Sequence, residues 1–178
     1  MKTLAKKIIF ILFIFNTIII LSCKQPVEKK LNLDDYNVPL QKINRYLVKE
    51  DSERIENYIA RKEWDMKSTL TGLRYQIYSN GNGINAEIDK IATINFTVEL
   101  LDGTLCYSSD SVGQKRFKIG KGGVESGLEQ GLLLMKVGDK ARFILPPFLG
   151  HGLLGDEYKI PPRSIIVYDV ELINISDY

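Results

Sequence analysis

Histidine and cysteine are scarce in this chain, and their scarcity excludes much chemistry. Its 178 residues contain one histidine and two cysteines. They form neither a His-x-x-x-His nor a Cys-x-x-Cys pair, so a structural zinc site or a metal hydrolase is not expected, and we predict no metal and no cofactor. Two cysteines are also too few for a disulfide-stapled domain.

The chain also lacks an excess of charge of one sign. It has 24 Lys+Arg against 22 Asp+Glu, and 44% of its residues are hydrophobic. This composition is typical of a globular protein of one domain with appendages, because a single core uses roughly 100 to 150 residues. The near balance of charge argues against a nucleic-acid partner.

The charges that do occur are unevenly placed, and the first residues predict an export signal. Lys2, Lys6 and Lys7 precede an apolar run over residues 8–21, and no acidic residue occurs before Cys23. A basic start and a short apolar run fit a secretory signal better than a transmembrane helix of about 20 residues. An uncleaved N-terminal anchor helix is the alternative, and both interpretations place the rest of the chain outside the cytoplasm.

The end of the apolar run, Leu21-Ser22-Cys23, resembles a bacterial lipobox. The resemblance implies that Cys23 is lipidated and becomes the new amino terminus, with the lipid as a membrane anchor. Removal of residues 1–22 takes away three lysines and leaves 21 Lys+Arg against 22 Asp+Glu. Cys106 then has no intramolecular disulfide partner, so we expect a half-buried thiol, with an intermolecular bridge as the alternative.

The mature chain divides into a tether, a helical extension and a domain. Residues 23–38 are polar and predict a tether. Residues 39–70 show helical spacing, with Pro39 in a first turn and Asp51-Ser52 supplying a cap between two short helices. Residues 71–178 form the folded domain.

Within this domain apolar residues alternate with polar ones at every second position, which is the pattern of β-strands. Strands are expected at 73–78, 91–101, 104–107, 116–119, 140–145 and 164–175, with a helix at 124–135. This pattern predicts an α+β fold in which one short helix packs against a twisted antiparallel sheet.

Two familiar types of active site are not expected here. The glycine-rich run 120–127 lacks the Gly-Lys-Ser/Thr ending of a phosphate loop, and Glu125 would repel phosphate. Ser126, His151 and Asp156 could be imagined as a triad, but no serine lies in a nucleophile-elbow sequence.

Several short motifs occur in an order that resembles FKBP-type peptidyl-prolyl isomerases. They are Leu-Asp-Gly at 101–103 with Tyr-Ser-Ser at 107–109, Phe-Lys-Ile-Gly-Lys at 117–121, Gly-Leu-Glu-Gln-Gly at 127–131 with Met-Lys-Val-Gly-Asp at 135–139, and Ile-Pro-Pro at 160–162 with Val-Tyr-Asp-Val-Glu-Leu at 167–172. The resemblance covers residues 73–175. It implies an FKBP-like sheet wrapped on one helix, and an isomerase acting on X-Pro bonds of exported polypeptides.

The lipobox and the helical extension add a second resemblance, to lipid-anchored FKBP-like proteins associated with gliding motility in Bacteroidetes-type bacteria. It rests on this layout and on residues 155–162. We therefore expect a protein on the periplasmic side of a membrane, the outer rather than the inner one. The alternatives are a catalytically weak chaperone or binding module, and a component of a motility or secretion apparatus that docks through residues 39–66.

The family resemblance also implies the site residues, several of which depart from the family's pattern. Phe96 stands in place of a tyrosine, Cys106-Tyr107 in place of a Phe-Asp pair, and His151 in place of a loop tyrosine. The loss of an aromatic wall at Cys106 predicts an isomerase of reduced rate, by roughly tenfold to hundredfold. The full set of expected site residues is Phe96, Tyr107, Phe117, Val124, Glu125, Leu128, His151, Ile160 and Tyr168.

Overall fold

The computed structural model describes residues 34–177, of which those from Gln41 onward belong to one compact unit. The predicted signal segment, the predicted lipidation site Cys23 and most of the predicted tether lie outside the described residues. Helix α2 spans Asp34–Lys62, so it begins inside the segment predicted as a tether and contains Pro39. None of the helices in the described range is apolar over a length that would cross a bilayer.

The prediction of two short helices divided at Asp51 was wrong, because α2 continues through this position. The Asp51 carboxylate does not cap a second helix. It is 5% exposed and pairs with Arg163 at 2.9 Å and with Arg54 at 3.8 Å. A charge removed from water needs such partners, and here they lie on the loop before the last strand and on α2 itself.

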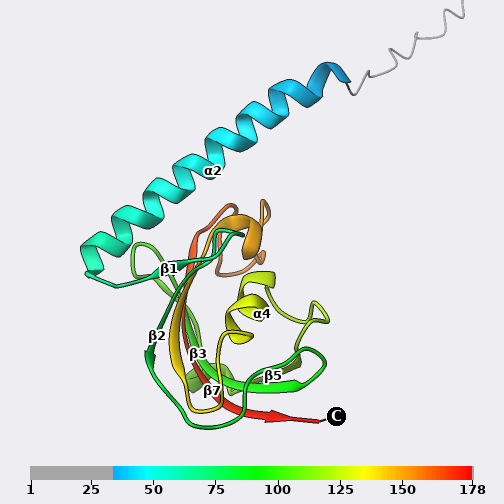
Figure 1. The fold of residues 1–178 in the computed structure, drawn as a ribbon. Coiled ribbons are helices and arrows are strands. Elements are labelled where there is room, and N and C mark those ends of the chain that lie inside the picture. Colours follow the sequence, from blue (N-terminus) through cyan, green and yellow to red (C-terminus); the bar gives the residue numbers. More distant parts are fainter. Residues whose placement is uncertain (1–33, 178) are drawn as a thin grey trace, which may run out of the picture. The chain divides into compact units, whose positions relative to one another are not determined.

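Antiparallel strands form one twisted sheet (Figure 1), as the sequence predicted. Their order is β1-β2-β6-β7-β3-β4, with β5 also paired to β3. The bounds are β1 Lys67–Ser68, β2 Arg74–Ser79, β3 Ile91–Leu100, β4 Leu105–Ser108, β5 Lys115–Lys118, β6 Lys140–Leu145 and β7 Ile166–Ser176.

Strand β3 organises one half of the sheet. Along one edge it pairs with β7 over its whole length. Along the other edge its first residues pair with β5, and residues from Thr97 onward pair with β4. The short helix α3, Ser109–Val112, connects β4 to β5 and was not predicted.

Helix α4, Ser126–Leu132, lies within the curve of the sheet (Figure 1). It is shorter than the predicted 124–135, because Leu134 and Met135 form tighter i→i+3 hydrogen bonds at its end. Leu128 and Leu132 are fully buried in the main core. The helix approaches the sheet closely through two glycines: a Cβ on Gly131 would lie 2.7 Å from Phe143 Cζ, and one on Gly127 would lie 2.5 Å from Leu145 Cγ.

The opposite face of the sheet carries a second, smaller core. Ile55 and Tyr58 of α2 pack there with Ile144, Ile165 and Val167. Phe143 and Leu145 belong to the main core while Ile144 belongs to this one, as alternation along β6 requires. The sheet is therefore covered on both faces by helices.

The close approach of α4 leads to a stability prediction. We expect Gly131→Ala to lower the free energy of unfolding by about 1–2 kcal/mol, because overpacking against the buried Phe143 ring outweighs the gain in helix propensity. Gly123→Ala is the matched control, since its Cβ would meet only Phe117 Cβ at 3.9 Å. Urea unfolding of the three proteins measures the effect, and equal stability of all three would contradict this account of the packing.

Candidate active site

A cleft of about 360 Å³ opens between Glu125, which directly precedes α4, and the strands β3, β4, β5 and β7. The loop that follows the short 3₁₀ helix η1, Pro147–Leu149, supplies a further wall. The lining residues are Phe96, Val98, Tyr107, Val112, Lys115, Glu125, His151, Asp156 and Tyr168.

The structure brings most of the predicted site residues together. Phe96, Tyr107, Glu125, His151 and Tyr168 line the cleft. Val124 lines an adjoining hollow that shares Lys115, Glu125 and His151 with it. Leu128 and Ile160 belong to the hydrophobic core, with 0% and 2% of their surface exposed, and do not line the cleft.

Phe117 does not line the cleft; Lys115, on the same strand, does. The register of β5 against β3 pairs Lys115 with Ile94 and Phe117 with Ala92. Residues two apart point to the same face of a strand, so the alternating pattern cannot say which of the two reaches the cleft. Phe117 packs instead against the main core.

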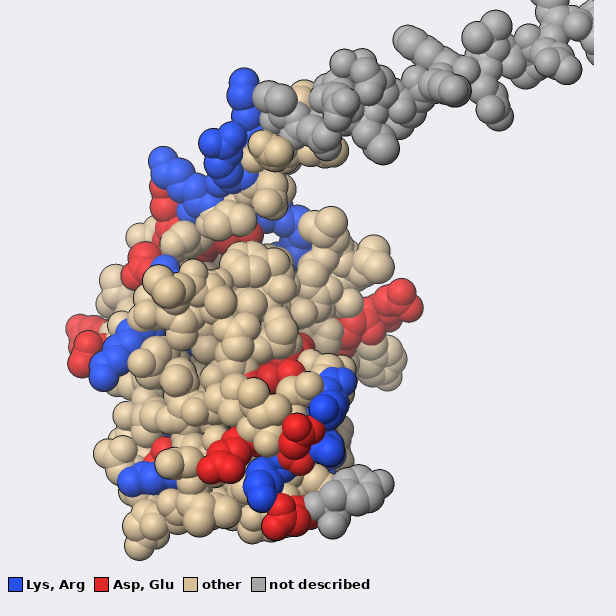
Figure 2. All heavy atoms as spheres, turned by 45° about the vertical axis from the view of Figure 1, so that its right-hand side comes forward, with Lys and Arg blue, Asp and Glu red and all other residues tan. Residues whose placement is uncertain are grey.

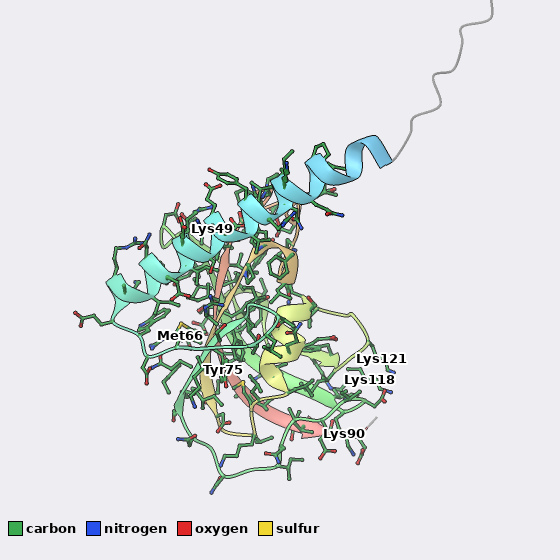
Figure 3. All side chains as sticks on the ribbon, turned by 45° about the horizontal axis from the view of Figure 1, so that its top comes forward. Lys49, Met66, Tyr75, Lys90, Lys118 and Lys121 are labelled. Carbon is green, nitrogen blue, oxygen red and sulfur yellow. The ribbon has the colours of Figure 1, made fainter. Side chains whose placement is uncertain are left out.

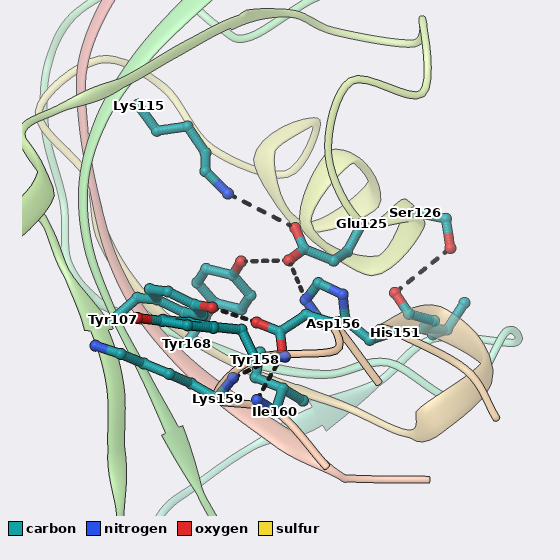
Figure 4. A network of polar contacts seen from close by, with 11 residues as sticks. Tyr107, Lys115, Glu125, Ser126, His151, Asp156, Tyr158, Lys159, Ile160 and Tyr168 are labelled. Carbon is teal, nitrogen blue, oxygen red and sulfur yellow. Dashed lines mark hydrogen bonds and ion pairs between the residues drawn. The ribbon is translucent and has the colours of Figure 1, made fainter. Parts of the chain in front are cut away.

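Glu125 is the centre of a polar network in the cleft (Figure 4). Its side chain is 8% exposed. One carboxylate oxygen, Oε1, accepts a hydrogen bond of 2.9 Å from the Tyr168 hydroxyl and lies 2.8 Å from His151 Nε2. The other, Oε2, lies 4.0 Å from Lys115 Nζ. The carboxylate thus lies close to side chains from the start of β5, from the last strand and from the loop after η1.

Burial and the nearby negative charge of Glu125 both raise the pKa of Tyr168 well above its usual value. Tyr168 therefore keeps its proton and acts as a donor to Glu125. The same carboxylate engages His151 Nε2, and Nδ1 has no hydrogen-bond partner among the described residues. In the neutral ring with a proton on Nε2, Nδ1 is an acceptor, so His151 can donate to a carbonyl through it only in the protonated form.

The backbone of Glu125 offers a donor that does not depend on protonation. Its N–H has no hydrogen-bond partner within the described part of the chain. The N–H and the side chain of Glu125 therefore have separate tasks: one can fix a ligand carbonyl, while the other organises the polar side of the cleft.

A second polar cluster fixes the loop between Gly152 and Ile160. Asp156 Oδ1 accepts backbone hydrogen bonds from Tyr158, Lys159 and Ile160 at 2.9, 2.9 and 2.7 Å, and Oδ2 accepts one from the Tyr107 hydroxyl (Figure 4). Burial raises the pKa of Asp156, but these hydrogen bonds outweigh burial and lower it to about 2. The bond to Asp156, with burial, raises the pKa of Tyr107 to about 12.

Sequence reasoning missed Val98, Val112, Lys115 and Asp156 as lining residues. Val98 lies two residues after Phe96 on the same face of β3, so strand alternation could have indicated it. No local signal marks the other three, because they lie in the short helix α3, at the start of β5 and in a loop, whose placement depends on the fold.

The cleft does not contain an activated nucleophile among the described side chains. Cys106 is 2% exposed, more buried than the half-buried thiol we expected, and burial followed by the charge of Asp156 raises its pKa. Ser126 Oγ donates to the Leu149 carbonyl at 3.5 Å rather than to His151. The aromatic and valine side chains instead form walls suited to holding an apolar ring without covalent chemistry.

Several charged side chains elsewhere on the compact unit form ion pairs. Lys90, Lys118 and Lys121 gather at one end of the sheet (Figure 3). Lys118 and Lys121 pair with Asp89 at 3.5 and 2.8 Å, and Lys90 pairs with Asp177. On the lower part of the face shown in Figure 2, basic and acidic groups likewise lie next to one another. Because of these acidic partners, the three lysines do not form a surface patch of purely positive charge.

Comparisons with known proteins agree on one family. Residues 83–173 match the family described as FKBP-type peptidyl-prolyl cis-trans isomerase. A probable FKBP-type isomerase of Haemophilus influenzae is 33% identical over 130 residues, which are 72% of this chain and 53% of that protein. The isomerase FkpA of Aeromonas hydrophila is 33% identical over 152 residues, 80% of this chain and 55% of its own. The chain thus spans about half the length of these two relatives.

Solved structures show the same fold. The crystal structure of FkpA from Escherichia coli has a TM-score of 0.63 and 25% identity, and the match covers 96% of this chain and 82% of that one. The crystal structure of AtFKBP13 has a TM-score of 0.60 and 27% identity, covering 64% of this chain and 100% of that one.

The Asp156 cluster leads to a pH prediction. Because its pKa is lowered from 3.8 to about 2, the ionised form stabilises the folded loop above pH 3.8, and this contribution is lost as the pH falls toward 2. We expect Tyr107→Phe, which removes one hydrogen bond to the carboxylate, to move the loss to higher pH. The amide NMR shifts of Tyr158, Lys159 and Ile160 report the midpoint.

Tyr158→Phe is the matched control, since this ring lies on the same loop and is 84% exposed. Its midpoint should equal that of the unmodified chain. An unchanged midpoint in Tyr107→Phe would show that the Tyr107 hydroxyl does not hold Asp156 in solution.

Proposed function

The chain belongs to the FKBP-type peptidyl-prolyl cis-trans isomerase family, and from this premise we propose that it accelerates rotation about X-Pro bonds of polypeptides. The observation that carries the proposal is the cleft walled by Phe96, Tyr107 and Tyr168, which lies within the residues matched to the family. Proline-containing unfolded segments are the proposed substrates.

The reaction needs no nucleophile, because no covalent bond is made or broken. Rotation of a peptide bond meets a barrier of about 18–20 kcal/mol, since the planar amide loses its conjugation as it twists. The twisted amide is less dipolar than the planar one, so an apolar, water-poor wall favours it. The free N–H of Glu125 can hold the adjacent carbonyl while the rings hold proline.

This proposal predicts the effect of a charge on the apolar side of the cleft. Val112 lines the cleft and is 61% exposed, so Val112→Glu should fold normally and reduce kcat/KM for a proline-containing peptide by about tenfold. Leu105→Glu is the control, because Leu105 is 55% exposed and lies outside the cleft. Acceleration above the uncatalysed rate, measured with the full chain, tests the activity; no acceleration at micromolar protein would refute it.

A second candidate function is a binding module that holds proline-containing segments without turnover. The observation that favours it is the pair of charged groups in the cleft, Lys115 and Glu125, where an isomerase would use apolar walls. Slowed aggregation of an unfolded client together with absent peptide turnover would support this alternative. A structural component of a motility or secretion apparatus, docking through residues 39–66, is a third and separate alternative.

We further propose that the chain is exported and held by a lipid on Cys23, on the periplasmic side of a membrane and with the outer membrane favoured. Support comes from the basic start, the apolar run and the Leu21-Ser22-Cys23 sequence. The clients would then be exported polypeptides.

The anchoring proposal predicts a change of compartment. Cys23→Ser should abolish incorporation of a labelled fatty acid and release the protein from the membrane fraction, because the thiol is the proposed attachment atom. Cys106→Ser is the control and should leave both labelling and fractionation unchanged. Retained label in Cys23→Ser would contradict the proposal.

A further inference from the structure

The polar side of the cleft holds a carboxylate with spare hydrogen-bonding capacity. Glu125 is 8% exposed, and its Oε2 is buried without a hydrogen-bond partner among the described residues. The nearest cation, Lys115 Nζ, is 4.0 Å away, beyond hydrogen-bond length. An unsatisfied buried acceptor is costly, more so when it is charged, so a ligand that brings a donor to Oε2 gains an interaction that the free protein lacks.

The balance of charge in the cleft favours a donor that is also a cation. The lining contains two carboxylates, Glu125 and Asp156, against one lysine, Lys115. Asp156 already accepts four hydrogen bonds, from Tyr107 and three backbone N–H groups. Glu125 is therefore the carboxylate with room for a new partner, and opposite charges attract more strongly in a partly buried site than in water.

Proline cannot supply this donor, because its nitrogen carries no hydrogen in a peptide. The donor has to come from a neighbouring residue of the substrate. The bond that rotates joins proline to the residue before it, so that residue necessarily lies at the cleft whenever its X-Pro bond is bound. A long side chain with an ammonium or guanidinium group at its end can reach a buried carboxylate while its stem covers apolar surface.

We propose that Glu125 is a specificity-determining residue, which makes the cleft favour X-Pro segments in which X is lysine or arginine over those in which X is apolar or acidic. This inference rests on the proposed function, because it concerns the same cleft and the same substrates.

Lys115 is the internal competitor for Glu125. Its ammonium lies 5.2 Å from the centre of the Phe96 ring as well as 4.0 Å from Glu125, and its side chain is 34% exposed. A substrate lysine or arginine would take over the contact with Oε2 while Lys115 moves toward solvent. Removal of the Lys115 charge should therefore strengthen the preference for a basic residue, whereas removal of the Glu125 charge should abolish it.

The experiment uses the full chain and three peptides that differ only in the residue before proline, namely lysine, leucine and glutamate. Dissociation constants from NMR titration and kcat/KM from the isomerisation assay are measured for each. The unmodified chain should prefer the lysine peptide to the glutamate peptide by about tenfold or more, the equivalent of ~1.4 kcal/mol. Glu125→Gln should bring this ratio close to one, and Lys115→Met should raise it.

Glu157→Gln is the matched control, because it removes the same charge from an exposed position on the Gly152–Ile160 loop that does not line the cleft. Its selectivity should equal that of the unmodified chain. An increase in selectivity for Lys115→Met would exclude misfolding as the cause of the change, since a misfolded protein would not gain selectivity.

The two proposals fail in different ways. Binding with the expected order of affinity but no turnover would refute the isomerase function and support the specificity of Glu125. Turnover or binding with equal preference for the three peptides would overturn the specificity proposal while the isomerase function stands. An unchanged lysine preference in Glu125→Gln would also overturn it.

Discussion

The close approach of α4 to the sheet is the constraint on which the site depends. Gly127 and Gly131 leave room for Leu145 and Phe143 of β6, so the helix lies against the strands with Leu128 and Leu132 buried. Glu125 directly precedes this helix, and the helix position therefore decides where its carboxylate and its N–H lie. A wider separation would move Glu125 away from Tyr168 and His151, and the polar side of the cleft would not form.

Around this contact the cleft combines two kinds of wall. The rings of Phe96, Tyr107 and Tyr168 give it the apolar character that an amide rotation requires. Glu125 and Lys115 add fixed charges that a purely apolar pocket lacks. Such charges cost binding energy for an apolar ligand and add to it for a complementary one, so they act on the choice of substrate more than on the rotation itself.

The loop that covers the cleft is held by one carboxylate. One oxygen of Asp156 accepts hydrogen bonds from three backbone N–H groups, and the other accepts one from the Tyr107 hydroxyl. In this chain Tyr107 thus has a ring that lines the cleft and a hydroxyl that fixes the loop. The wall of the cleft and the loop are therefore coupled through the Tyr107 side chain. A comparison of sequence motifs shows only that Tyr107 replaces another residue type and does not reveal this coupling.

The sequence by itself determined the buried helix, and six of the seven strands in the described range to within one or two residues at each end, because hydrophobic alternation and turn residues are local signals; the two-residue strand β1 was missed. The motif order also led to the family and to five residues that line the cleft. It could not choose between Lys115 and Phe117, which share a face of β5, and it divided α2 at Asp51 because the partner Arg163 is distant in the chain. Only the tertiary structure decided these points, since each depends on contacts between residues far apart in sequence.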